Sequence, residues 1–89
     1  MDYIPTEDLA FYILDEIVSE KSDNPEHGNF RILNEVIENV QAKYAVDKDA
    51  TDGGWAYLLD RRFVKGAQNG NLWLVALSPE GIKWLDERR

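Results

Sequence analysis

The spacing of apolar residues near the start of the chain predicts an amphipathic helix from about Glu7 to Lys21. Apolar side chains recur there at intervals of three and four residues, and the acidic residues fall largely on the other faces. Thr6, which follows Pro5, is the expected N-cap, and the carboxylates after it suit the positive end of the helix dipole. The segment Ser22–Asn29 collects turn-forming residues and is predicted to be a loop. The stripe expected to face the core consists of Ala10, Ile13, Leu14, Ile17 and Val18.

A second helix is predicted from about Arg31 to Lys43. Its apolar residues share one face at helical spacing, although residues 29–32 also alternate between polar and apolar and could instead form a short strand. The segment 47–52 then reads as a polar connection to the next helix. The apolar stripe of the second helix consists of Phe30, Leu33, Val36, Ile37, Val40 and Tyr44.

A third helix is predicted at Trp55–Arg62, but where it starts is ambiguous. Gly53 and Gly54 each disfavour a helix interior by about 1 kcal/mol relative to Ala. Either the helix begins after them, or the backbone approaches another element closely at that point. The expected cap is Asp49, Thr51 or Asp52. The apolar face consists of Trp55, Leu58, Leu59 and Phe63.

The following segment predicts a β-hairpin, with runs at 63–68 and 71–77. Between them, Asn69 and Gly70 suit the positive φ values of a two-residue type I′ turn. This turn would pair Gln68 with Asn71, Gly66 with Trp73 and Val64 with Val75.

The second run of this hairpin is apolar on both faces. One face would carry Val64, Trp73, Val75 and Leu77, and the other would carry Phe63, Leu72, Leu74 and Ala76. Because a domain this small readily covers only one face, Leu72, Trp73 and Leu74 are expected to contact a partner or to form a homodimer. Trp73 alternatively packs over Gly66 across the hairpin.

After the hairpin, the turn Ser78–Gly81 is expected to open a last helix that carries Ile82, Trp84 and Leu85. Residues 1–89 are therefore predicted to form one α+β domain, mainly helical. The order of elements predicts a winged-helix domain, with three helices, a β-hairpin wing and a short C-terminal helix.

Composition restricts the function classes. The chain of 89 residues has a net charge of −7, which argues against indiscriminate nucleic-acid binding. The excess of negative charge lies in residues 1–28, which contain eight acidic residues and one basic residue, Lys21. The rest of the chain has equal numbers of acidic and basic residues. The absence of cysteine, of a signal peptide and of an apolar run near 20 residues predicts a cytoplasmic protein without a membrane partner.

No motif indicates catalysis. The segment Asp47–Thr51 matches D-x-D-x-T of dehalogenase-like phosphotransferases, but a capping segment is the preferred interpretation, because that chemistry needs a larger α/β sheet. It also lacks the glycine and the glutamate of an EF-hand loop. His27 is the sole histidine and is expected to be solvated in its loop. The sequence thus predicts a non-enzymatic protein with no metal and no cofactor.

Three runs in the C-terminal half carry a resemblance. Residues 58–66 read Leu-Leu-Asp-Arg-Arg-Phe-Val-Lys-Gly, residues 72–77 read Leu-Trp-Leu-Val-Ala-Leu, and residues 78–85 read Ser-Pro-Glu-Gly-Ile-Lys-Trp-Leu. They resemble small bacterial winged-helix proteins, in particular the YjcQ-like group of bacterial and phage proteins. The resemblance covers about half of the chain and implies the fold more specifically than any function.

The resemblance implies a role in binding double-stranded DNA or regulating transcription. In winged-helix DNA binders the third helix enters the major groove and the wing contacts the backbone or the minor groove. The expected contacts are Arg61, Arg62, Lys65, Tyr57, Gln68, Asn69 and Asn71. The third helix is poorly suited to recognising base edges, because its outward positions include glycines and Asp60. The alternative is a protein-interaction or dimerisation module that binds no nucleic acid.

Overall fold

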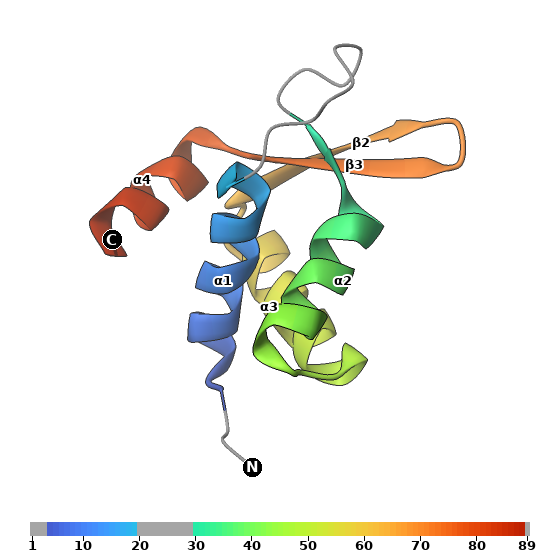
Figure 1. The fold of residues 1–89 in the computed structure, drawn as a ribbon. Coiled ribbons are helices and arrows are strands. Elements are labelled where there is room, and N and C mark those ends of the chain that lie inside the picture. Colours follow the sequence, from blue (N-terminus) through green and yellow to red (C-terminus); the bar gives the residue numbers. More distant parts are fainter. Residues whose placement is uncertain (1–3, 20–29, 89) are drawn as a thin grey trace.

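The computed structural model describes residues 4–19 and 30–88, and this part of the chain forms four helices and one three-stranded antiparallel sheet (Figure 1). The prediction of a mainly helical α+β fold is confirmed. The elements are α1 (Thr6–Ser19), β1 (Arg31–Ile32), α2 (Leu33–Tyr44), α3 (Lys48–Asp60), β2 (Val64–Asn69), β3 (Leu72–Leu77) and α4 (Pro79–Arg88). The strand order is β1-β3-β2, and α1, α2 and α3 lie on one side of the sheet.

Helix α1 carries the apolar stripe that its sequence predicts, with one exception. Ala10, Ile13, Leu14 and Ile17 are buried, whereas Val18 is 43% exposed. The helix begins at Thr6 itself, because the Leu9 N–H donates to the Pro5 carbonyl, so Thr6 is not the cap. The expected helix end at Lys21, the loop 22–29 and His27 all lie outside the described residues.

The alternative of a short strand before α2 is confirmed. Arg31 pairs with Val75 and Ile32 pairs with Leu74, so the edge of the sheet holds these residues extended and α2 starts two residues later than predicted. Ile32 precedes α2 without a side-chain cap. The helix then ends at Ala45, whose left-handed conformation (φ 53°) lets its N–H donate to the Gln41 carbonyl.

Helix α3 starts at Lys48, earlier than predicted, because Asp47 supplies the cap. The Asp47 side chain accepts a hydrogen bond of 2.9 Å from the Ala50 N–H, so the three caps expected from the sequence were wrong. The interpretation of the D-x-D-x-T segment as a capping segment is confirmed. Thr51 is buried, donates to the Lys48 carbonyl and accepts from the Gln41 side chain, which joins α3 to α2.

Gly54 explains why α3 tolerates two glycines. A Cβ at this position would lie 3.1 Å from Ile13 Cδ1 and 3.3 Å from Leu9 Cγ, so the close-approach alternative is confirmed. The missing side chain lets α3 pack directly on α1. A Cβ placed at Gly53 would have no atom within 4 Å, so no close packing requires glycine there.

These two neighbouring glycines should respond oppositely to substitution. Gly53→Ala should raise the free energy of unfolding by up to about 1 kcal/mol, because alanine favours the helix and meets nothing. Gly54→Val should lower it by about 1–3 kcal/mol, because the added methyl groups overpack the contact with α1. Urea unfolding measures both variants, and equal effects at the two sites would contradict the assigned contact.

The hairpin forms as predicted, but its turn is one residue further along. Asn69 pairs with Leu72, so the turn residues are Gly70 and Asn71. Of these two residues only Gly70 has a positive φ (62°), as in a type II′ turn. The predicted register was therefore wrong by two residues, with Trp73 opposite Gln68 and Val64 opposite Leu77. A shift of two preserves which side chains share a face.

The expectation that strand β3 leaves one apolar face uncovered was wrong for most of its length. All four residues from Leu74 to Leu77 are buried, so Leu74 is not part of a free interface. Val75 and Leu77 belong to the core formed with the helices. Leu72 and Trp73 alone in this strand stay exposed, at 40% and 58%.

Ser78 starts helix α4, as predicted. Its Oγ accepts from the Gly81 N–H at 3.1 Å and donates to the Arg62 carbonyl at 2.7 Å, and its N–H donates to the Phe63 carbonyl. The turn after α3 and the turn before α4 are thus bound together. Gly81 is buried directly against the backbone of Phe63.

Candidate binding surfaces

Arg61 and Arg62 lie at the end of α3, where two backbone hydrogen bonds close the helix. The Arg62 N–H donates to the Leu59 carbonyl and the Phe63 N–H donates to the Leu58 carbonyl, which is the Schellman pattern. Arg62 has a φ of 59°, in the left-handed region that usually selects glycine. Both arginines are exposed, so this corner of the molecule carries two solvated positive charges.

Tyr57 does not project from α3 as a free reading residue. The guanidinium of Arg61 lies 4.3 Å from the centre of the Tyr57 ring, and that ring lies 6.3 Å from Trp84 of α4. Tyr57 is therefore part of an aromatic contact between α3 and α4. Arg61, another of the predicted DNA contacts, covers its ring.

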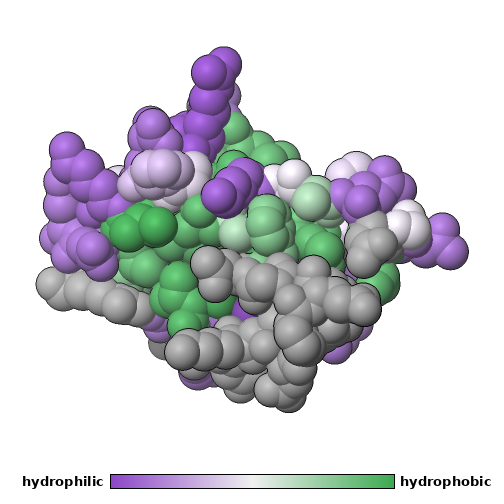
Figure 2. Space-filling model, turned by 90° about the horizontal axis from the view of Figure 1, so that it is seen from above, coloured by the Kyte–Doolittle hydropathy of each residue, from purple (hydrophilic) through white to green (hydrophobic). Residues whose placement is uncertain are grey.

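Lys65 lies on the face of the sheet that is turned away from the helices. It pairs with Ala76, and its ammonium group lies 5.9 Å from the centre of the Phe30 ring. Phe30 precedes Arg31, and the antiparallel register continues to place it opposite Ala76, so the lysine stem reaches across the strand between them. Seen from above the sheet, hydrophobic residues extend across the middle of the molecule, and hydrophilic residues lie at its left and right (Figure 2).

The predicted wing-tip contacts are far from the arginine corner. Gln68 near the turn and Asn71 within it are exposed, and the Gln68 side chain donates to the Gly70 carbonyl. Asn69 ends β2, and its side chain lies outside what the structure describes. At about 3.3 Å per residue, strand β2 separates this tip from Arg62 by roughly 20 Å. The predicted DNA contacts thus fall into three groups: the end of α3, Lys65 on the face of the sheet away from the helices, and the wing tip.

The exposed face of α3 is acidic. Asp49, Asp52 and Asp60 are exposed on it, together with Gly53 and Ala56. Lys48 at its start is held by a 3.0 Å ion pair with Asp52, and the hydrogen bond with that carboxylate raises the pKa of Lys48 above its usual value. Within residues 4–19 and 30–88, the cations without a carboxylate partner are Arg61, Arg62, Lys65 and Lys83.

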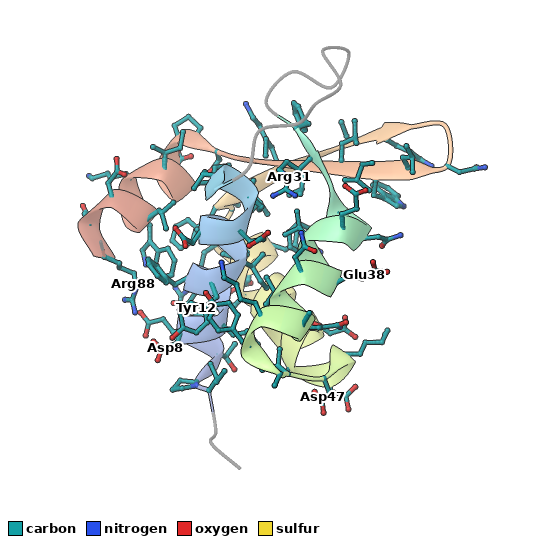
Figure 3. All side chains as sticks on the ribbon, viewed as in Figure 1. Asp8, Tyr12, Arg31, Glu38, Asp47 and Arg88 are labelled. Atoms are coloured by element: carbon teal, nitrogen blue, oxygen red, sulfur yellow. The ribbon has the colours of Figure 1, made fainter. Side chains whose placement is uncertain are left out.

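A hollow of about 280 Å³ lies between α2 and α3. Its apolar residues are half-buried and pack on the core, whereas the polar residues around them are mostly exposed. Figure 3 shows Glu38 on the outer side of α2. The lining consists of Leu33, Asn34, Ile37, Glu38, Gln41, Lys48, Asp52 and Trp55. The sequence placed Leu33, Ile37 and Trp55 in core stripes and so missed this surface.

A second hollow, of about 420 Å³, lies between α1 and α4 and is lined by Asp8, Phe11, Tyr12 and Arg88. Arg88 forms ion pairs with Glu7 at 2.9 Å and with Asp8 at 3.5 Å (Figure 3). Its guanidinium also lies 4.8 Å from the centre of the Trp84 ring. These contacts join the start of α1 to the end of α4 and pair the charged groups of the hollow, Asp8 and Arg88, with each other.

In the described part of the chain, no group of His, Asp or Glu could hold a metal ion, and no helix has the length and apolar character needed to cross a membrane. Comparison with protein-family models, with curated proteins and with solved structures gave no match. The resemblance to the YjcQ-like group stays a prediction.

Proposed function

We propose that this chain is a winged-helix domain that acts as a non-enzymatic binding module. The order of its elements supports the fold. Helices α2 and α3 are joined by residues 45–47, the hairpin β2–β3 follows as the wing, and the short β1 pairs with the central strand. This arrangement presents α3 and the hairpin as the elements available to a partner.

The preferred partner is a protein, because the exposed face of α3 is acidic. In a winged-helix DNA complex that face would meet phosphates, yet it presents Asp49, Asp52 and Asp60. The one cation that begins the helix is paired with Asp52. Phosphate repulsion at the reading helix would therefore oppose DNA binding, whereas a basic protein surface would be attracted.

Double-stranded DNA is the second candidate, favoured by the cations that have no carboxylate partner among the described residues. Arg61 and Arg62 lie together, and Lys65 follows on the next strand. Such a site would neutralise only a few phosphates, so binding would be weak, with a shallow dependence on salt. It would also discriminate little between sequences, because phosphate contacts position a protein without specifying bases.

A fluorescence anisotropy titration with duplex DNA at low salt separates the two candidates. We expect no saturable binding at tens of micromolar protein, because the acidic α3 face and the net charge of −7 oppose it. Saturable binding that weakens in the variant Arg61→Ala with Arg62→Ala, and alike across sequences, would replace the protein proposal by the DNA proposal.

Affinity capture from the source cells gives the positive test. The immobilised chain should retain a protein in near-equal amount, and treatment with nuclease should not release it. Release by nuclease would show that nucleic acid bridges the two, which would contradict a direct protein partner.

A further inference from the structure

Trp73 stands next to the hollow between α2 and α3. It shares its strand face with Val75 and Leu77, which pack on the helices, so its side chain is on the helix side of the sheet. Leu33, which lines the hollow, directly follows the residue that pairs with Leu74. The register therefore places Trp73 beside the first turn of α2, and Figure 1 shows the hairpin extending past this helix.

The apolar residues of this region suit an incoming helix. Leu33 and Ile37 are four residues apart and so form a ridge along α2, with Trp55 facing them from α3. A helix presents anchors at the same spacing of three and four residues. Trp73 is 58% exposed at the end of this ridge, and tryptophan is among the side chains that contribute most when an interface buries them.

The charges around the hollow select the chemistry of the partner. Glu38 on α2 and Asp52 on α3 stand on its two sides, and Lys48 is paired with Asp52. Asp49 adds a further exposed carboxylate on α3. A partner with lysine or arginine beside its apolar face would be attracted to these carboxylates, and an acidic partner would be repelled.

We propose that the groove formed by Leu33, Ile37, Trp55 and Trp73, called here the tryptophan groove, binds a basic amphipathic helix of a partner protein. The inference rests on the proposed function of protein binding and names the surface and the chemistry of the partner. The apolar face of the incoming helix covers Trp73 and the ridge of α2. Its basic residues lie against Glu38 and Asp52.

The test uses the full chain and a synthetic peptide of about 18 residues, with leucine at helical spacing on one face and lysine on the other. The control peptide has the same composition in an order that puts the leucines on no single face. Nitrogen-15 NMR spectra of the protein resolve three indole N–H signals, from Trp55, Trp73 and Trp84. The signals of Trp55 and Trp73 should shift as peptide is added, and the shifts should saturate. The signal of Trp84, which lies on α4 and packs against Phe63, should not shift.

Two variants and one matched control sharpen this test. Trp73→Ala should raise the dissociation constant of the peptide at least about tenfold, which corresponds to about 1.4 kcal/mol. Glu38→Lys should also raise it, and the effect should fade at high salt. Ile82→Ala removes an apolar side chain of similar exposure (50%) from α4 and should leave the dissociation constant unchanged.

Three results would overturn the tryptophan groove. The control peptide could bind as tightly, which would mean attraction by net charge alone. The Trp84 signal could respond in place of the other two, which would place binding elsewhere while leaving a protein-binding function intact. The peptide could also leave all three signals unmoved. The capture experiment above decides the proposed function independently of each of these results.

Discussion

Gly81→Ala is expected to lower the free energy of unfolding by about 3 kcal/mol or more. A Cβ at this position would overlap with the carbonyl oxygen of Phe63 and would lie 2.8 Å from its carbonyl carbon. Backbone atoms cannot rotate away as a side chain does, so α4 or strand β2 would have to shift. Since Ser78 binds α4 to this same backbone, the shift would break the hydrogen bonds that start the helix.

The sign of this effect is informative, because helix propensity alone predicts the opposite. Alanine is favoured over glycine in a helix by about 1 kcal/mol. Gly53→Ala therefore serves as the control, since it offers the same substitution in a helix without a neighbour. Thermal and urea unfolding measure both variants. A Gly81→Ala variant as stable as the wild type would mean that α4 does not pack on Phe63 as described.

Arg31→Met is expected to lower the free energy of unfolding by about 3 kcal/mol. Arg31 and Glu16 have side chains only 7% exposed, and their charged groups lie 3.9 Å apart. The guanidinium also donates a hydrogen bond of 2.6 Å to the Glu16 main-chain carbonyl. Removing the arginine leaves a buried carboxylate with weaker compensation, which is the costly way to break such a pair.

Lys43→Ala is the matched control, because Lys43 pairs with the same carboxylate at 3.8 Å but is 57% exposed. Its loss should change the stability by less than about 1 kcal/mol. Adding Glu16→Met to Arg31→Met should recover part of the loss, because no carboxylate is then left buried. If Arg31→Met and Lys43→Ala have equal effects in urea unfolding, the buried pair does not have the importance assigned to it.

The elements that follow from local patterns were the ones that the sequence could predict. The α1 stripe, the hairpin and the Ser78 start of α4 each depend on residues within a few positions of one another. The Asp47 cap of α3 is local as well, but the course of this helix through Gly54 depends on a partner distant in sequence, because Gly54 reads as a helix breaker until α1 packs against it. The hairpin turn failed for a different reason: Asn69-Gly70 and Gly70-Asn71 both suit two-residue turns.

The candidate surfaces were harder to predict than the fold. Arg61, Arg62 and Lys65 are close together in the sequence, but alternation along β2 turns Lys65 to the face of the sheet away from the helices, and the strand separates Gln68 from the arginines. The tryptophan groove had no sequence signal of its own, because a half-buried ridge and a buried stripe share the same period. Only the tertiary arrangement distinguishes them.

The central position of β3 has a kinetic meaning. The hairpin closes across two residues, whereas pairing β1 with β3 joins residues about 42 positions apart, and closing such a loop costs about 3 kcal/mol of chain entropy more than the shortest contacts. Strand β1 should therefore dock after the hairpin has formed, and it should be among the first elements to detach. Because that docking also brings Leu33 beside Trp73, the tryptophan groove is completed late in folding and opens early in partial unfolding.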